Sequence, residues 1–309
     1  MASWQSKYIQ RLLQMTWDRE VAPEMSAARL RARHAKLVQN FVRPAIDVEV
    51  IPVKAGAVEA EWIEPMGAQF HRVVLYLHGG GYVAGAPAGY RNLVARLATA
   101  ASARALLLDY RLAPEHVFPA ALEDTLGAYK WLLLQGLDPS GIILAGDGSG
   151  GGMAIAAALA LRDNKAPMPG AIVALSPWTD LALSGRTLIK NAEKDKLLSI
   201  ELLAYCAQNY LKGALPTNAL ASPLYGALAG LPPMLIHAGA NEILRDDAAR
   251  LADKGHRAGV DVSVEVFEGM PHVFQLFEKI PEAEASLNRI GAFIKSRTIS
   301  VPMRMMAAQ

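Results

Sequence analysis

Gly146-Asp147-Gly148-Ser149-Gly150-Gly151-Gly152 follows a short apolar run, Ile142–Ala145, and precedes an alanine-rich stretch that continues to Arg162. The apolar run is typical of a strand that is buried within a sheet, and the stretch after the glycines is typical of a helix. Glycines are needed between them because the turn is sharp and the helix packs close to the neighbouring strands. A strand, a tight glycine-rich turn and a helix together predict a nucleophile elbow.

Two phosphate-binding motifs compete with this interpretation, because a glycine-rich turn before a helix also binds phosphate groups. A P-loop requires a Lys-Ser or Lys-Thr pair directly after its glycines, and no such pair comes directly after Gly152. Gly146, Gly148 and Gly151 have the spacing of a dinucleotide fingerprint. That fingerprint follows the first strand of its domain, whereas the strand here is internal, so the elbow is favoured.

A second glycine-rich turn, His78-Gly79-Gly80-Gly81-Tyr82, follows the apolar run Arg72–Leu77. Three consecutive glycines after a buried strand allow backbone N–H groups to turn toward a ligand. This is the pattern of the oxyanion loop that accompanies an elbow in α/β-hydrolases. The pairing of the two turns argues against an ordinary glycine-rich loop.

Apolar runs and helical patterns alternate along the chain, which predicts an α/β fold with a mostly parallel, eight-stranded sheet and helices on both faces. The expected strands are 47–53, 58–63, 72–77, 103–108, 141–145, 171–175, 233–237 and 262–266. The expected helices between and after them are 90–101, 119–135, 149–162, 243–258 and 281–295.

Two segments fall outside this alternation. Residues 1–45 predict two amphipathic helices, and residues 184–225 interrupt the strand–helix rhythm. We expect an N-terminal helical cap segment, 1–45, and an α/β-hydrolase domain, 46–309, whose residues 184–225 contribute to the cap. Such a cap would cover the carboxyl edge of the sheet, where ligands bind in these folds.

The composition excludes several classes of protein. Apolar residues make up 52% of the 309 residues and charged residues 19%, which excludes a disordered chain. A net charge of +2 does not indicate a nucleic-acid partner. The single cysteine, Cys206, cannot form an internal disulfide, and neither a signal peptide nor a membrane span is found. We therefore expect a cytoplasmic protein.

The chain resembles the bacterial hormone-sensitive-lipase-like carboxylesterases between residues 70 and 275. This resemblance implies an α/β-hydrolase that cleaves carboxylic esters of short to medium acyl chains. It also implies a small-molecule ester as partner, and neither an organic cofactor nor a metal. The motifs that carry it are His78–Tyr82, Asp109–Glu115, Phe118–Ala121 with Asp124, the elbow, Leu175–Trp178 and Gly269–His272.

Two triad positions depart from the family pattern. Aligned without gaps, the position of the nucleophile falls on Gly148, and the position of the acid in the turn after strand 233–237 falls on Asn241. The base is retained as His272, in the order along the chain that α/β-hydrolases use.

The resemblance also assigns the oxyanion hole to the backbone N–H groups of Gly80, Gly81 and Ser149. Without a hydroxyl at position 148 no acyl-enzyme can form there, so we expect an impaired esterase. An amide at 241 would carry no charge to stabilise an imidazolium. On this alignment, Gly148→Ser should lower thermal stability, and Asn241→Asp together with Gly148→Ser should raise esterase activity.

Two other functions stay open. Ser149 could act as the nucleophile of an active hydrolase if the elbow were shifted by one residue. Alternatively, the chain could be a non-catalytic binder of esters or apolar small molecules, in a pocket lined by Met15, Trp17, Phe41, Tyr210 and Leu211. A homodimer through the last strand and helix is a further expectation, because an edge strand needs covering.

Overall fold

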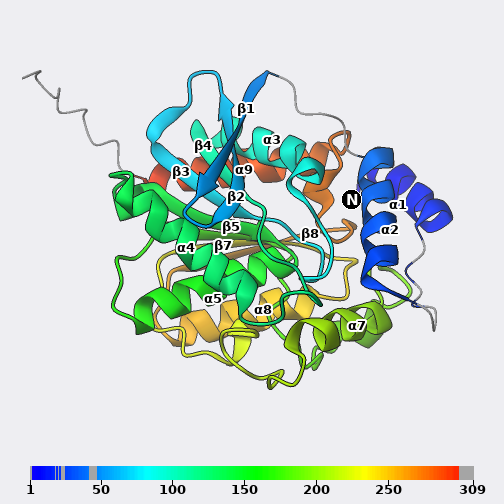
Figure 1. The fold of residues 1–309 in the computed structure, drawn as a ribbon. Helices are drawn as coiled ribbons and strands as arrows, with labels where there is room; N and C mark the ends of the chain where they lie inside the picture. The colour runs from blue at the N-terminus through cyan, green and yellow to red at the C-terminus, as the bar shows by residue number, and fades with distance from the viewer. Residues whose placement is uncertain (1, 18, 20, 22–24, 42–46, 299–309) are drawn as a thin grey trace, which may run out of the picture.

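The apolar runs form one sheet in the computed structural model, which describes residues 2–17, 19, 21, 25–41 and 47–298 (Figure 1). Its strands are β1 Val48–Ala55, β2 Val58–Pro65, β3 Gln69–Leu77, β4 Ala103–Leu108, β5 Ile142–Asp147, β6 Ala171–Leu175, β7 Met234–Gly239 and β8 Val262–Phe267. The strand order is β1-β2-β4-β3-β5-β6-β7-β8. β2 is antiparallel to β1 and to β4, and all other neighbours are parallel. The predicted α/β-hydrolase sheet is confirmed.

Helices pack on both faces of this sheet, as Figure 1 shows. They are α1 Trp4–Thr16, α2 Ala27–Phe41, α3 Arg91–Ala101, α4 Ala120–Leu134, α5 Ser149–Asp163, α6 Thr187–Lys190, α7 Ile200–Leu211, α8 Arg245–Arg257 and α9 Pro281–Arg297. One face of the sheet forms a core with α4, α5 and α8, and the other face forms a core with α3 and α9. The central strands are buried on both sides, because each is a continuous apolar run.

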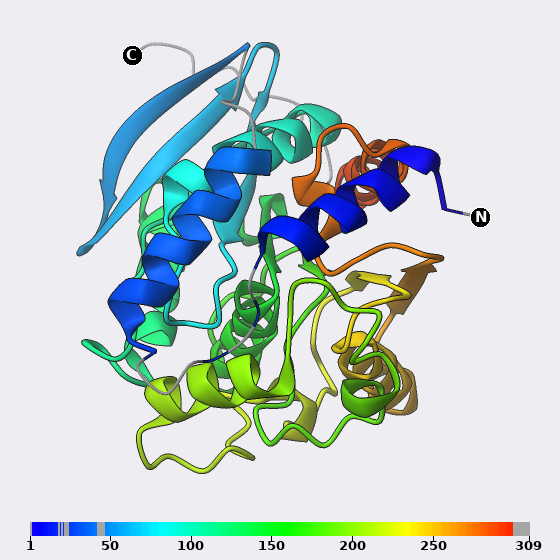
Figure 2. The same cartoon turned by 90° about the vertical axis from the view of Figure 1, so that its right-hand side faces the viewer.

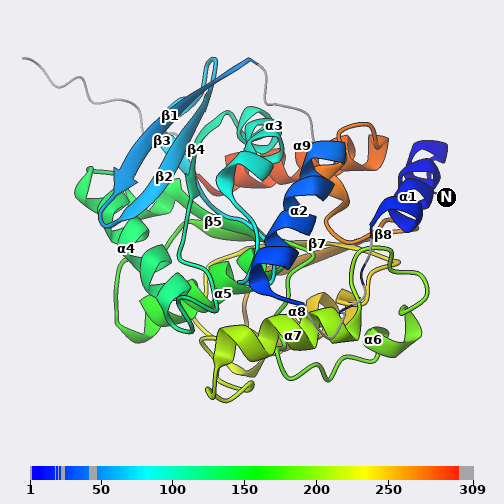
Figure 3. The same cartoon turned by 45° about the vertical axis from the view of Figure 1, so that its right-hand side comes forward.

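The two helices expected in the N-terminal segment are present. Figure 3 shows α1 and α2 on the side of the molecule where α6 and α7 also lie. The Trp17 indole Nε1 donates a hydrogen bond to the carbonyl of Leu197 at 2.8 Å, which ties the end of α1 to the segment before α7. Among the described residues, no helix has the length and apolar character that crossing a bilayer requires.

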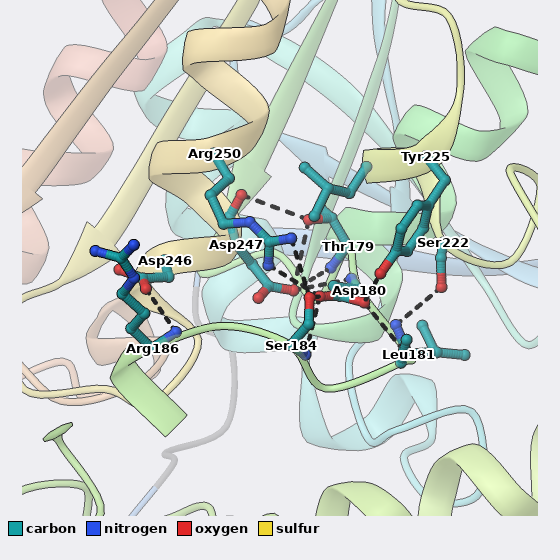
Figure 4. A network of polar contacts seen from close by, with 12 residues as sticks. Thr179, Asp180, Leu181, Ser184, Arg186, Ser222, Tyr225, Asp246, Asp247 and Arg250 are labelled. Atoms are coloured by element: carbon teal, nitrogen blue, oxygen red, sulfur yellow. Dashed lines mark hydrogen bonds and ion pairs between the residues drawn. The ribbon is translucent and has the colours of Figure 1, made fainter. Parts of the chain in front are cut away.

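A buried polar network fixes the segment after β6 to the start of α8 (Figure 4). The side chain of Asp180 is fully buried and pairs with the Arg250 guanidinium at 2.9 Å. It also accepts hydrogen bonds from the Ala182 N–H, the Ser184 hydroxyl and the Tyr225 hydroxyl. Because so many donors converge on one carboxylate, the network holds the whole segment that follows β6 against the sheet.

The neighbouring acidic pair on α8 is structural, as its position within the helix suggests. Asp247 accepts hydrogen bonds from the N–H groups of Thr179 and Asp180 at 2.8 and 2.9 Å. Asp246 accepts a hydrogen bond from the Arg186 N–H at 2.7 Å. Both carboxylates therefore satisfy backbone donors of the segment after β6.

We predict that Asp180→Ala lowers the free energy of unfolding by about 2–4 kcal/mol, because it leaves several buried donors without an acceptor. Urea denaturation followed by circular dichroism measures this change. Asp253→Ala is the matched control: Asp253 pairs with Arg257 on the exposed side of α8, and its loss should change stability by less than about 0.5 kcal/mol. Equal effects of the two variants would contradict the structural role of the network.

Candidate active site

The elbow is held in register by two glycines that approach the backbone of β3. A Cβ added at Gly146 would lie 2.5 Å from the carbonyl oxygen of Leu77, and one added at Gly150 would lie 1.9 Å from the same atom. No side chain fits at either position. The residue midway between them, Gly148, therefore occupies the central position of the Gly-x-x-x-Gly turn, which is the position of a nucleophile.

Gly148 has the backbone conformation of a strained elbow, with a φ of +51° and a ψ of −118°. Its carbonyl accepts hydrogen bonds from the Gly152 N–H and the Trp178 N–H, and its own N–H donates to Leu175. A Cβ added here would lie 3.4 Å from Nε2 of His272. A side-chain oxygen on that Cβ would lie within reach of the imidazole.

The acid that partners His272 is Glu242, and the assignment of Asn241 is wrong. Nδ1 of His272 lies 2.5 Å from Oε2 of Glu242, whose side chain is fully buried. The other oxygen, Oε1, accepts a hydrogen bond from the Gly239 N–H at 2.7 Å, which folds the turn after β7 around the carboxylate. The Asn241 amide instead donates to Gln10 Oε1 at 3.1 Å and to the Gly269 carbonyl at 3.3 Å.

Asn241 was assigned as the acid from its position along the chain, without regard to how far a side chain at the next residue could reach. Glutamate is one methylene longer than aspartate, so a carboxylate can reach the imidazole from the next residue along the turn. A simpler signal was available: Glu242 is the only carboxylate between Gly239 and Leu244. The charge missing at position 241 is therefore present at 242.

Glu242 sets the protonation of His272. Burial on its own lowers the pKa of His272, but the hydrogen bond and the negative charge of Glu242 outweigh burial and raise that pKa. The carboxylate therefore stabilises an imidazolium and orients Nε2 toward Gly148.

Two glycines of the loop 78–82 lie in the pocket that Gly148 and His272 also line. Gly80 and Gly81 have positive φ angles of 119° and 65°, and a Cβ at Gly80 would lie 2.1 Å from the Ala84 carbonyl oxygen. Gly80, Gly81 and Ser149 line one pocket together with Gly148 and His272. Their expected role as oxyanion donors stays a prediction that this arrangement favours.

His78 braces the loop, as the sequence suggests. It is fully buried, and its ring stacks on Tyr110 at a centroid distance of 4.3 Å and on Tyr90 at 5.3 Å. Burial lowers the pKa of His78 to about 4, so the ring is neutral at physiological pH. The Tyr110 hydroxyl donates to the His78 carbonyl at 2.6 Å and fixes the backbone there.

The Ser149 hydroxyl is hydrogen-bonded to the oxyanion loop. Ser149 begins α5, is 2% exposed, and its hydroxyl accepts a hydrogen bond from the Tyr82 N–H at 3.3 Å. Among the described residues, no hydrogen bond joins Ser149 to His272. The shifted elbow that would make Ser149 a nucleophile has no support in this geometry.

The pocket above the elbow is largely apolar and has a volume of about 100 Å³. Its walls come from α2, the end of α1 and the start of α7, through Leu30, Leu37, Trp17, Leu198 and Leu202. Of the five residues expected to line it, Trp17 does so. Met15 is 74% exposed, whereas Tyr210 and Leu211 are buried in the core. The side chain of Phe41 lies outside the described residues.

A bridge connects α1 to both loops of the Glu242–His272 pair. Gln10 donates to the carbonyl of Gly269, which precedes His272, at 2.9 Å, and it accepts from Asn241, which precedes Glu242. The Asn241 N–H also donates to the Met270 carbonyl at 3.1 Å. Docking of α1 therefore secures the two loops that position the acid and the base.

We predict that Gln10→Ala lowers the free energy of unfolding by about 1–2 kcal/mol, because it removes one hydrogen bond from the Asn241 amide and one from the Gly269 carbonyl. Thermal or urea denaturation measures the change. Gln14→Ala, an exposed position one turn further along α1, is the control and should be neutral within about 0.5 kcal/mol. A neutral Gln10→Ala would show that the bridge does not hold the loops.

Asp147 provides a pH-dependent prediction. It is buried beside the elbow, where its carboxylate accepts hydrogen bonds from the Tyr76 hydroxyl at 2.9 Å and the Gly79 N–H at 3.0 Å. Burial raises the pKa of Asp147 to about 7. The folded state therefore holds a proton that the unfolded state has already lost above pH of about 4. The bound proton makes its full contribution to the free energy of unfolding below about pH 4, and this contribution is lost as the pH rises through about 7.

Asp147→Asn should remove this dependence, because the amide oxygen can still accept both hydrogen bonds but does not ionise. Between pH 4 and 7 we expect the unfolding free energy of the unaltered chain, relative to the variant, to fall by up to about 1.4 kcal/mol per pH unit. Urea denaturation of both proteins across this range measures the difference. A difference that does not change with pH would contradict the raised pKa.

Comparison with known proteins identifies the family of the chain. A family model described as alpha/beta hydrolase fold matches residues 74–276. An acetyl-hydrolase of Streptomyces hygroscopicus is 40% identical over 96% of this chain and 98% of its own length. An esterase of Acinetobacter venetianus is 34% identical over 84% of this chain and 90% of its own.

Solved structures extend the similarity to three dimensions. The crystal structure of an esterase from the bacterial hormone-sensitive lipase family has a TM-score of 0.91 and 41% identity, and covers 97% of this chain and 100% of that one. The crystal structure of EstE5 soaked with p-nitrophenyl butyrate has a TM-score of 0.90 and 36% identity, and the match covers 96% of this chain and 99% of that one. The chain therefore belongs to the alpha/beta hydrolases, and within them to the bacterial hormone-sensitive-lipase-like carboxylesterases.

Proposed function

We propose that this carboxylesterase-type protein binds short- to medium-chain carboxylic esters and hydrolyses them slowly, because Gly148 replaces the nucleophile. One observation carries the proposal: a Cβ on Gly148 would lie 3.4 Å from Nε2 of His272. The acid–base pair of Glu242 and His272 is therefore aimed at a position that has no side chain. An acyl-enzyme cannot form there.

Water takes the place of the missing hydroxyl in the proposed mechanism. Nε2 of His272 removes a proton from a water molecule as the water oxygen attacks the ester carbonyl carbon. The N–H groups of Gly80, Gly81 and Ser149 stabilise the negative oxygen of the tetrahedral intermediate. The intermediate collapses, the bond to the alcohol oxygen breaks, and His272 returns the proton to the alcohol. In enzymes whose triad has been deleted, the oxyanion hole and substrate binding still accelerate the reaction by about 10³–10⁴-fold over the rate in water.

The pocket supports a short acyl group. Its volume of about 100 Å³ is smaller than a cavity that holds one benzene molecule, about 150 Å³. Leucine is the most frequent residue in its largely apolar walls, so an alkyl chain is stabilised by leaving water for this pocket.

A non-catalytic binder remains the second candidate, and the same absent side chain favours it. If His272 does not activate water, an ester would occupy the pocket and leave it intact. Recovery of unchanged ester after long incubation distinguishes the binder from the slow hydrolase. The use of Ser149 as nucleophile is disfavoured, because its hydroxyl is held by the Tyr82 N–H.

Residues 1–45 and 184–225 are proposed to form the cap over the pocket. The hydrogen bond from Trp17 to Leu197 supports this division, since it joins the two segments at the pocket wall. A homodimer through β8 and α9 also stays a proposal. β8 is an edge strand whose Val264 and Val266 are 36% and 40% exposed.

We predict that Gly148→Ser alone raises kcat/KM for p-nitrophenyl butyrate by about 10³–10⁶-fold, since Glu242 already supplies the charge expected of an acid. Asn241→Asp should add nothing to it. Gly148→Ser should also lower the free energy of unfolding by about 1–3 kcal/mol, because a residue with a Cβ is strained at the φ of +51° found at position 148. Activity assays and denaturation of the same preparations measure both effects.

Three controls test the assignment. A fluorophosphonate probe should label the Gly148→Ser protein and not the unaltered chain. Ser149→Ala should leave the slow activity of the unaltered chain within about twofold, a change of less than 0.5 kcal/mol. Glu242→Gln in the Gly148→Ser background should lower kcat by about 10⁴-fold. Labelling of the unaltered chain at Ser149, or an inactive Gly148→Ser protein, would refute the proposal.

A further inference from the structure

The outward face of α1 carries an unusual set of exposed side chains. Trp4, Tyr8 and Met15 are 72%, 56% and 74% exposed. With 3.6 residues per turn, these three positions fall within about 40° of one another around the helix axis. Figure 2 shows α1 at the outside of the molecule. The exposed stripe of Trp4, Tyr8 and Met15 therefore belongs to a helix on the surface.

The stripe is not explained by a loosely attached helix, because the opposite face of α1 is firmly docked. Leu13 is fully buried in a cluster with Phe274 and Ile280. Ser3, which caps the helix, donates to the Glu282 carboxylate through its N–H at 2.7 Å and its hydroxyl at 2.8 Å. The helix is therefore held rigidly, with an aromatic and apolar face turned to solvent.

Cations flank the stripe. Lys7 and Arg11 lie on the adjoining side of α1, and both are exposed. With Lys196 they line a surface groove of about 470 Å³ that also reaches Gln10 and Asn241. In the part of the chain that the structure describes, no carboxylate lines this groove. The face formed by the stripe and these cations is thus both apolar and positively charged.

We infer that this face of α1 docks the protein on an anionic lipid bilayer surface. Tryptophan and tyrosine favour the boundary between headgroups and acyl chains, because one end of each ring is apolar and the other is polar. Lysine and arginine beside them are attracted to anionic headgroups. A helix with these two features lies in the plane of the interface without crossing it.

Charge argues against a second copy of the chain as the occupant. A symmetric dimer would place the same face of both α1 helices together. Lys7 and Arg11 of one copy would then meet the same cations of the other, and like charges in contact weaken association. An anionic surface has the complementary charge.

Docking through α1 would also bring the ester pocket near the lipid. Trp17, which follows the last turn of α1, lines that pocket, and its indole N–H donates a hydrogen bond to the Leu197 carbonyl. An apolar ester dissolved in the bilayer would then reach the pocket without crossing bulk water. This interaction does not depend on whether position 148 supports catalysis.

Vesicle co-sedimentation of the full chain tests the inference. We expect binding to vesicles of phosphatidylcholine mixed with phosphatidylglycerol and little binding to phosphatidylcholine alone, with the difference reduced at high salt. Trp4→Ser/Tyr8→Ser/Met15→Ser, and separately Lys7→Glu/Arg11→Glu, should each weaken binding to the anionic vesicles by at least about tenfold. The salt dependence needs no variant, so a variant that misfolds does not remove the test.

Matched controls change the same kinds of residue elsewhere. Met66→Ser/Leu134→Ser removes side chains that are 96% and 74% exposed, and Lys130→Glu/Lys295→Glu reverses two other surface charges. Both should retain vesicle binding. The inference is overturned if the unaltered chain does not bind anionic vesicles, or if the controls lose binding as much as the α1 variants. It is also overturned if the α1 stripe variant abolishes a dimer in light scattering while vesicle binding is absent.

Discussion

The active site depends on how closely the backbone of α5 approaches the backbone of β3. Leu77 leaves no room for a Cβ at position 146 or 150, so the turn between them can follow only one path. That path places residue 148 above the end of β5 and below His272. Gly148 differs from Gly146 and Gly150, because a Cβ at position 148 would meet no atom closer than 3.4 Å.

Glu242 and His272 are held in place by hydrogen bonds that do not involve residue 148. Glu242 is buried, and a buried carboxylate is stable only when hydrogen bonds or an opposite charge compensate for the water that it loses. The Gly239 N–H and His272 provide that compensation. Neither interaction involves residue 148. The acid–base pair therefore persists as part of the folded structure, whatever catalytic rate it supports.

Helix α1 has two faces with separate consequences. Its inner face reaches the acid and base loops through Gln10, which contacts Asn241 and Gly269. Its outer face presents aromatic side chains and cations to solvent. The two hydrogen bonds of Gln10 connect α1 directly to the loops of Glu242 and His272. Displacement of α1 would therefore break these bonds and change the position of both loops.

The eight strands and the two glycine-rich turns were predictable from local sequence patterns, whereas the roles of oxyanion donors and base stay predictions. Buried parallel strands are continuous apolar runs, and glycines are required where backbones meet, so both leave a local pattern. The acid was decided by tertiary structure. Whether residue 241 or 242 reaches His272 depends on the fold of the turn around Gly239 and on side-chain length. The exposure of Met15 was also a tertiary outcome. The sequence predicted that Met15 lines the pocket, but α1 docks through Leu13 against Phe274 and Ile280, and Met15 on the other side of the helix is exposed.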